Sequence, residues 1–342
     1  MRIFKLLLLS IFSCVLSLSH AQDIHFSQFN LSPLTLNPAY TGAFEGSFRI
    51  GGIYRDQWRS VIDNQFVTPS FYIDAPIIRG FGKNDWVGVG VSILNDKAGT
   101  SELSRLNAML SLAYHLALGS KANTYISIGA QGGMVQKKIT TTALTFADQF
   151  QGGQFVGSSA DLSNIPDDNI SYLDFQAGLV LNSNVTSKFN FYLGYSAHHL
   201  TQPEDAFLTN TPNDDKKLSM RHVANGGFNI DFGKRWVFSP TALYQRQASA
   251  SETDIQALFG YHLKTDKTVT LNFGAGYRLK DAAIARIGMD IKGLKAGIAY
   301  DFNTSDLTSA SSGRGGFEIA LAYIAKIYRT PVVKPVLFCP RF

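Results

Sequence analysis

Cysteine is scarce in this sequence. The 342 residues contain only Cys14 and Cys339, which lie near opposite ends of the chain. Cys14 falls in a segment that we expect to be removed, so one cysteine remains in the mature chain. A single cysteine forms no internal disulfide and builds no cysteine-rich metal site. The sequence therefore excludes both of these stabilising devices.

Charge is also scarce. Charged residues make up 17% of the sequence, compared with roughly 25% in soluble domains. Lysine and arginine number 31 against 26 acids, which gives a formal net charge of +5 without any basic cluster. This weak and dispersed positive charge excludes a protein that binds nucleic acid.

The one long apolar run stands at the start of the chain. After a positively charged start, residues 6–18 are largely apolar, and Ser19 and Ala21 fit a signal-peptidase site. A transmembrane helix needs about 20 apolar residues, so we predict a cleaved signal peptide over residues 1–21. An uncleaved anchor and a lipoprotein modification at Cys14 are the alternatives. No later run reaches 18 apolar residues, which excludes a transmembrane helix in the mature chain.

The chain shows instead a repeated alternation of apolar residues with small or polar ones. Residues 267–280, 188–200 and 294–303 are the clearest examples, and aromatic residues make up 12% of the sequence. Successive side chains of a strand point to opposite faces, whereas an amphipathic helix needs a period of about 3.6 residues. The alternation therefore predicts strands with one apolar face and one polar face.

Fourteen segments follow this pattern. Most have ten or more residues, which exceeds the usual ~5–6 of globular strands and matches the ~9–11 of tilted membrane strands. We predict an all-β fold, a transmembrane up-and-down antiparallel β-barrel of about 14 strands (12–16 allowed), over residues 47–328. The predicted strands are 47–58, 65–75, 85–95, 102–117, 122–135, 170–183, 188–200, 218–232, 234–248, 253–264, 267–280, 281–292, 293–304 and 314–328.

The predicted connections alternate in length. Tight turns follow the even-numbered strands, except for a somewhat longer loop at residues 76–84, while the longest loops are residues 136–169, 201–217 and 305–313. An outer-membrane barrel has short periplasmic turns and long outer loops, so the even strand count predicts both termini in the periplasm. A soluble β-sandwich or barrel is the alternative, and it has no reason to sort its loops.

Two end segments do not alternate. Residues 22–46 contain Pro33 and Pro38, and residues 329–342 form a proline-rich tail. Proline lacks the N–H that a sheet requires, so neither segment is a regular inner strand. Both contain apolar side chains that would be exposed to water if the segments were free in the periplasm. A barrel of this size also has a lumen that the side chains of its wall alone do not fill. We therefore expect one or both ends to fold into the lumen or its periplasmic mouth.

Arginine recurs on the predicted strands. An arginine that faces lipid at the membrane midplane costs roughly 2–4 kcal/mol, so we expect these side chains in the lumen. Pairing with acids or with plug carbonyls is favoured over an anion-binding role. The residues concerned are Arg49, Arg55, Arg59, Arg221, Arg246, Arg278 and Arg286.

The search for catalytic or metal chemistry yields little. His198 and His199 are adjacent on a predicted strand, so we expect them on opposite faces, where they cannot share a metal ion. Ser196 and His198 share a face, but no third member of a triad is evident. We predict no catalytic, cofactor or metal site and no enzyme activity.

Several motifs, in order along the chain, closely resemble the PorP/SprF family. One departure is Gly316-Phe317, where many members have Ser-His, so no role for a histidine is carried over to that position. The motifs are Gln22–Phe29, Leu36–Gly42, Tyr54–Trp58, Phe71–Pro76, Val87–Gly90 with Asn95-Asp96, Gly316–Ile319 and Cys339–Phe342.

The resemblance implies an outer-membrane component of the type IX secretion system that is linked, in some bacteria, to gliding motility. Its partners would be a large secreted adhesin, bound through the adhesin's C-terminal domain, other secretion components and outer-membrane lipid. The rival function is a passive or ligand-gated diffusion channel, and a membrane hydrolase is the weakest alternative. The family-motif residues, expected to contact the plug or the partner, are Asn37, Pro38, Tyr40, Gly42, Arg55, Trp58, Cys339, Pro340, Arg341 and Phe342.

Overall fold

The structure is a computed structural model of the chain. It describes residues 23–62, 64–79, 84–99, 101–119, 123–152, 154–155, 157, 159, 165, 168–207 and 216–327. The predicted signal peptide and the C-terminal tail, with Cys339, Pro340, Arg341 and Phe342, lie outside the described residues.

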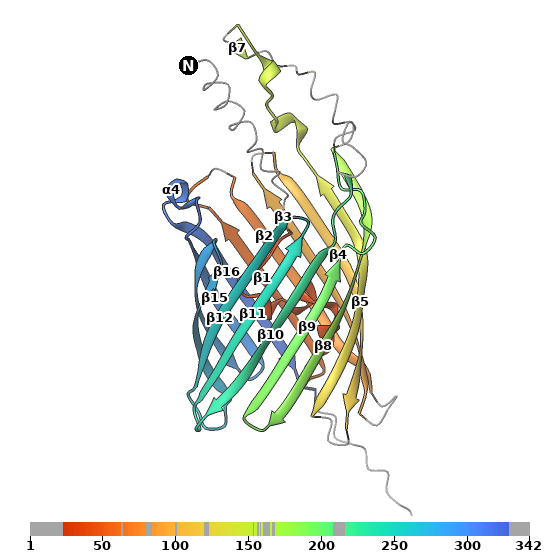
Figure 1. The fold of residues 1–342 in the computed structure, drawn as a ribbon, viewed down its shortest axis with the longest axis vertical. Helices are drawn as coiled ribbons and strands as arrows, with labels where there is room; N and C mark the ends of the chain where they lie inside the picture. The colour runs from red at the N-terminus through yellow and green to blue at the C-terminus, as the bar shows by residue number, and fades with distance from the viewer. Residues whose placement is uncertain are drawn as a thin grey trace, which may run out of the picture.

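Fourteen antiparallel strands form one closed barrel (Figure 1). Neighbours in sequence are neighbours in the sheet, and the first strand pairs with the last, so the barrel has no free edge. The strands are β1 (Phe48–Gln57), β2 (Phe66–Arg79), β3 (Trp86–Ala98), β4 (Leu103–Leu118), β5 (Thr124–Lys138), β8 (Asn169–Thr186), β9 (Phe189–His198), β10 (Arg221–Phe232), β11 (Trp236–Gln247), β12 (Ala250–His262), β13 (Val269–Arg278), β14 (Ala282–Ile291), β15 (Leu294–Asn303) and β16 (Arg314–Ala325).

This architecture confirms the predicted fold, and each predicted segment corresponds to one strand. The predicted loop 136–169 has local structure of its own, which its glycine-rich sequence does not reveal. It contains the 3-10 turns η3 (Thr141–Ala143) and η4 (Ala147–Gln149) and the two-stranded sheet of β6 (Phe150–Gln151) and β7 (Gln154–Phe155).

The two mouths of the barrel differ. The long-loop mouth carries the connections between β5 and β8, β9 and β10, and β15 and β16, the last with helix α4 (Thr308–Ser311) (Figure 1). The short-turn mouth carries the tight turns after β4, β8, β10 and β14. The sorting by length is less complete than predicted, because β11–β12 and β13–β14 are also joined by tight turns at the long-loop mouth. Ala248 (φ 50°) and Lys280 (φ 62°) adopt the left-handed conformation there.

The outer surface is apolar between its two ends. Large side chains such as Leu110, Ile128 and Ile287 are exposed there, at 59–68% of their full area. Among the described side chains, those charged residues that face outward lie within one residue of the long-loop ends of their strands: Asp56, Lys97, Lys138 and Arg246. No helix in the described residues is long and apolar enough to cross a bilayer. The charge-free band suits lipid, where a buried charge is costly.

Two of the seven arginines expected in the lumen are elsewhere. Arg59 follows β1 in a loop, has 72% of its side chain exposed and pairs with Asp56 at 2.8 Å. Arg246 lies on the outward register of β11, near the long-loop mouth. Neither position requires a membrane-buried charge, because both lie beyond the apolar band.

Residues 23–46, called the plug from here on, cross the interior of the barrel (Figure 1). They form three short helical segments, η1 (Phe29–Leu31), α2 (Pro33–Leu36) and η2 (Pro38–Tyr40). Asp23 lies at the long-loop mouth against Arg105 and His199, and the plug leads into β1 at the other mouth.

The described ends of the chain therefore lie at opposite mouths, since β16 ends at the short-turn mouth. The termini themselves lie outside the described residues, so their placement in the periplasm stays a prediction. An even number of strands fixes only where the first and last strands end. The plug then carries the chain lengthwise through the lumen to the other mouth.

Candidate functional site

Glycines on the barrel wall form a cradle for the plug. A Cβ added to Gly88 would overlap the carbonyl of Thr41, and one added to Gly129 would overlap Pro38 and Ala39. Two further strand glycines meet plug side chains in the same way: Gly178 faces Asn37 and Gly297 faces Gln28. Glycine is required at such positions because only a residue without Cβ lets another backbone approach so closely. The wall is thus shaped to fit this one segment.

The Asn37-Pro38 pair of the family motif fixes the middle of the plug. Asn37 is fully buried and caps η2, because its Oδ1 accepts the N–H of Ala39 at 2.9 Å. Its Nδ2 donates to the carbonyls of Leu179 and Tyr195, both at 3.1 Å. Pro38 begins the turn, a position where its missing N–H has no cost. One side chain therefore orders the plug and ties it to β8 and β9.

Gly42 ends the Asn37–Gly42 motif of the plug. Its φ of 71° lies in the left-handed region, which favours glycine. The Gly42 N–H donates to Asp74 at 2.7 Å, and its carbonyl accepts from Trp86 Nε1 at 3.0 Å. Arg49 holds the same corner, since it donates to Asp74 and to the carbonyl of Tyr40. The motif Asn37–Gly42 is therefore bound to the wall at both of its ends.

A buried network of ions holds the first half of the plug. Arg55 of β1 pairs with Glu318 of β16 at 2.5 Å and with Asp301 of β15 at 3.0 Å. Arg278 of β13 also reaches Asp301, at 3.2 Å. Ser27 lies among these four side chains: its N–H donates to Glu318 at 2.7 Å and its hydroxyl to Asp301 at 2.6 Å. Buried charges are tolerated when paired and hydrogen-bonded, and this network meets both conditions.

A second charged cluster holds the start of the plug. The carboxylate of Asp23 contacts Arg105, lies 3.5 Å from Arg221 and 2.5 Å from His199 Nε2. Burial alone would raise the pKa of Asp23, but Arg105 and Arg221, together with His199, hold that pKa well below its ordinary value. Asp23 is therefore ionised over the physiological pH range.

The two adjacent histidines both enter the lumen, contrary to the expectation of opposite faces. His199 has a φ of 57°, which ends β9 and turns its ring inward, so His198 and His199 are both buried. Their ring centroids lie 6.4 Å apart, and His199 Nδ1 bonds Asp174 at 2.8 Å. Among the residues that the structure describes, no cluster of histidine, cysteine or acid side chains is arranged to hold a metal ion.

The Ser196–His198 pair is used to bind the plug. Ser196 Oγ lies 3.1 Å from His198 Nε2 and donates to the carbonyl of Leu36 at 2.9 Å. Both side chains are fully buried. The serine hydroxyl is therefore engaged with the protein's own backbone.

The family-motif residues divide into two places. Asn37, Pro38, Tyr40 and Gly42 belong to the plug, and Arg55 belongs to the ion network that holds it. Trp58 lies apart at the long-loop mouth, where its ring packs edge-on against Phe66 with centroids 5.3 Å apart. The sequence did not single out Ser27, Asp301 or Glu318. The alternation of apolar and polar residues within β15 and β16 places Asp301 and Glu318 on the inward faces, and this could have identified them.

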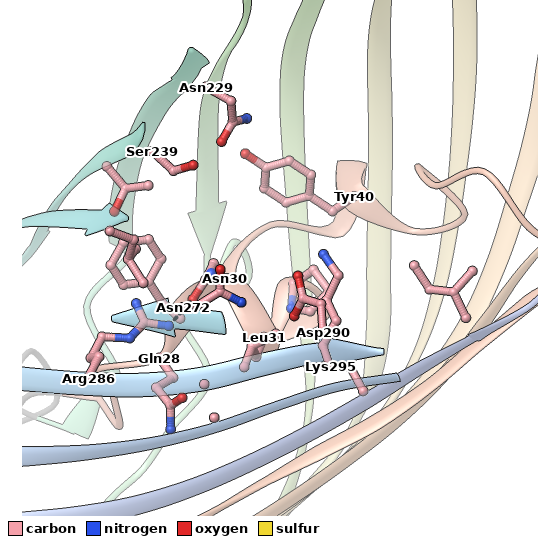
Figure 2. A pocket seen from close by; sticks show the side chains of 18 of the residues that line it. Gln28, Asn30, Leu31, Tyr40, Asn229, Ser239, Asn272, Arg286, Asp290 and Lys295 are labelled. Atoms are coloured by element: carbon pink, nitrogen blue, oxygen red, sulfur yellow. Dashed lines mark hydrogen bonds between the residues drawn. The ribbon is translucent and has the colours of Figure 1, made fainter. Parts of the chain in front are cut away.

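A cavity of about 470 Å³, called the vestibule from here on, lies between the plug and the short-turn mouth. Figure 2 shows Gln28, Asn30 and Leu31 of the plug beside Arg286 and Asn272 in its lining. Charged side chains are few in its lining, whereas amide and hydroxyl groups are many. The latter include Asn182, Asn225, Asn229, Asn272, Ser239 and Thr241.

Solved structures with a similar chain path are barrels of low sequence identity. The toluene transporter TbuX of Ralstonia pickettii is 11% identical with a TM-score of 0.48, covering 87% of this chain and 94% of that one. The monoaromatic hydrocarbon channel CymD is also 11% identical with a TM-score of 0.48, covering 87% and 93%. The KdgM porin is 10% identical with a TM-score of 0.38, covering 80% and 98%.

The sequence itself gives a family. None of the curated proteins matches it. The model of the family described as "Type IX secretion system membrane protein PorP/SprF" matches residues 18–323, which is most of the chain. The protein, a closed membrane barrel with a plugged lumen, therefore belongs to the PorP/SprF family of type IX secretion system membrane proteins.

Proposed function

We propose that this barrel lies in the outer membrane and binds a secreted cell-surface adhesin through the adhesin's C-terminal domain. In doing so it supports type IX secretion of the adhesin or its retention at the cell surface, and gliding motility in cells that glide. Family membership supports the link to secretion.

One observation carries the proposal: the lumen holds a segment of the same chain that is fitted to its wall. The glycine cradle fits the backbone of the plug closely, and the buried ion network binds it in the same position. A barrel filled in this way offers fixed surfaces for a partner and is poorly suited to the passage of solutes.

The long-loop mouth is the surface that we propose for the adhesin. The connection between β9 and β10 folds back on β5, since Lys137 pairs with Asp205 at 2.8 Å and lies over the ring of Phe207 at 5.5 Å. The loop after β5, which carries β6 and β7, rises beside it (Figure 1). Loops placed on a rigid scaffold are common binding surfaces.

Purification of the full chain from native membranes tests the proposal. We expect a large secreted protein to co-purify with the wild type. A variant in which residues 140–167 are replaced by a short Gly-Ser linker should lose it, because Lys138 and Asn169 are paired neighbours and the barrel can close without the loop. A variant with residues 305–312 shortened is the matched control and should retain the partner. A wild-type barrel that is always recovered alone would refute the proposal.

The second candidate is a passive or ligand-gated diffusion channel. The vestibule favours it, because the lumen between the plug and the short-turn mouth holds an open cavity. Recording currents across planar bilayers distinguishes the two functions: a plugged anchor gives no steps, and a channel gives discrete steps that a ligand alters.

We propose further that the protein catalyses no reaction. The engagement of Ser196 with the Leu36 carbonyl supports this. The Ser196→Ala variant should then differ from wild type in stability and plug binding alone, and any hydrolytic activity that it abolished would overturn this part of the proposal.

A further inference from the structure

The vestibule is a blind cavity. It opens toward the short-turn mouth, where Ala43, Asp290 and Lys295 line it, and plug residues such as Gln28 and Leu31 close its inner end. Its volume of about 470 Å³ falls within the range of ligand sites, roughly 300–1,000 Å³. A ligand that enters it must end there, because the plug blocks the way onward.

The inner end of the vestibule contains a buried cation without an acid. Arg49, Arg55, Arg105, Arg221 and Arg278 each form an ion pair in the lumen. Arg286 is 5% exposed, yet no carboxylate among the described residues lies within ion-pair distance of it.

The hydrogen bonds of Arg286 leave part of its donor capacity unused. Its Nη1 donates to Gln256 at 2.6 Å and its Nη2 to Asn30 at 2.8 Å, both neutral amides, while its Nε has no partner. A guanidinium has five N–H donors, and a buried charge is costly when no counter-charge touches it. Glu318, Asp254 and Asp301 act on Arg286 only from beyond ion-pair distance. Arg286 therefore supplies an unused site for an anion.

The wall of the vestibule carries further unpaired groups. Asn225 Oδ1, Thr241 Oγ1 and His262 Nε2 are buried without hydrogen-bond partners among the described residues, and all three side chains line the vestibule. Apolar side chains, including Leu36 and Leu258, also line the vestibule. This mixture suits a ligand whose body offers both donors and acceptors together with apolar groups, as an extended polypeptide does.

The charges at the entrance offset each other. Asp290 and Lys295 are cross-strand neighbours on β14 and β15, and Figure 2 shows them side by side, away from Arg286. Opposite charges in that arrangement leave little net field. The net positive charge of the vestibule therefore sits at its inner end, where the tip of an entering ligand would arrive.

We infer that the vestibule receives the free carboxyl end of a partner polypeptide from the short-turn side, with its terminal carboxylate on Arg286. The inference goes beyond the proposed function, because it concerns the mouth opposite to the one proposed for the adhesin and a polypeptide that enters from the short-turn side. Arg286 pairs with the carboxylate, and the unpaired groups of β10–β12 bind the main chain behind it. A chain end is required because a blind cavity of this volume admits no continuous strand.

The protein's own C-terminal residues are a poorer occupant. Residues 328–342 carry Arg329, Lys334 and Arg341 and no acidic residue. Insertion of this stretch into the vestibule would bring its positive charges toward Arg286 without any acid to offset them. Repulsion between like charges opposes this arrangement.

Pentapeptide libraries randomised at every position test the inference. The detergent-solubilised mature chain is incubated with a library that has free carboxyl ends or with the same library amidated at its C-terminus, and retained peptides are quantified by mass spectrometry. We expect the free-acid library to be enriched on the order of tenfold over the amidated one, which corresponds to one charge-assisted pair of about 1.4 kcal/mol.

Substitutions at Arg286 complete the test. Arg286→Gln should remove the preference for the free acid and Arg286→Lys should restore part of it, whereas the outward-facing Arg246→Gln should leave it unchanged. Co-purification of an adhesin tests the proposed function separately and does not depend on this result. Equal retention of both libraries, retention of neither, or a preference that survives Arg286→Gln would overturn the inference. Enrichment that appears only after removal of residues 328–342 would assign the site to the chain's own end and overturn it as well.

Discussion

The two halves of the lumen are built from the same strands but solve the problem of buried charge differently. Toward the long-loop mouth, Arg55, Arg105 and Arg278 meet acids, and the plug supplies some of the missing partners. Toward the short-turn mouth the space is open, the lining is mainly amides and hydroxyls, and Arg286 has no acid.

The difference shows which half is completed within the chain and which is not. In the filled half, removing any one charge takes a partner from a buried ion of opposite sign, a change that costs up to several kcal/mol. In the open half, most lining groups are neutral, so substitutions there should affect binding more than folding. The plug is thus a structural element, and the vestibule beneath it is the part of the lumen available to a ligand.

Removal of the plug should have the largest effect, because it would leave the filled half of the lumen as open as the other half. A variant that lacks residues 23–42 should pass ions in discrete steps where the wild type shows none, because the lumen of a 14-stranded barrel is too wide for wall side chains to fill. Planar-bilayer recording measures this change. Shortening of residues 305–312, which leaves the plug intact, is the control, and an equally silent deletion variant would show that the wall alone seals the lumen.

Loss of one charge in the filled half should have the next largest effect, on the stability of the barrel. Glu318→Gln keeps the shape of the side chain but leaves Arg55 with one acid and weakens the bond to Ser27. Breaking a buried pair costs about 3–5 kcal/mol. Urea unfolding in detergent, followed by electrophoretic mobility, measures the change. Asp290→Asn in the open half is the matched substitution, and equal losses for the two variants would contradict the distinction between the halves.

A side chain in the glycine cradle should have a smaller effect. Gly129→Val would drive methyl groups into Pro38 and Ala39, and overpacking costs about 1–3 kcal/mol. We expect the plug to become sensitive to added protease while the strands stay resistant. Ala130→Val, one residue away on the outward face, should change neither property. A plug that stays protected in Gly129→Val would mean that the cradle is wider than its contacts indicate.

Acid should loosen the plug at the long-loop mouth by a graded amount. The pKa of Asp23 is depressed in the docked state, so Asp23 stabilises docking above its ordinary pKa of about 4, and this contribution is lost as pH falls below that value. The loss is at most about 1.4 kcal/mol per pH unit. Protease sensitivity measured from about pH 6 down to about pH 3 follows it. Asp23→Asn should be looser at every pH and flatten the profile, and an unchanged slope in that variant would assign the acid response to another group.

The strands were predictable from the sequence because period-two alternation is a local property that each segment carries by itself. The plug was predictable as a non-strand segment from Pro33 and Pro38. Its lengthwise path was not, because that path depends on glycines such as Gly129 and Gly178, which come together only in the closed barrel. His199 was misplaced because a single left-handed residue reverses the face, and no glycine or asparagine marks that position.

The contact between Arg55 and Glu318 has a consequence for assembly. These residues are register partners on β1 and β16, so they meet at the seam where the first and last strands join. Both are also bound to Ser27 of the plug. If the barrel closed without its N-terminal segment, these two charges would line an unfilled space in the lumen. The closed wall would then hinder later insertion of the plug. During biogenesis, we therefore expect the N-terminal segment to enter the lumen before β16 pairs with β1 and closes the barrel.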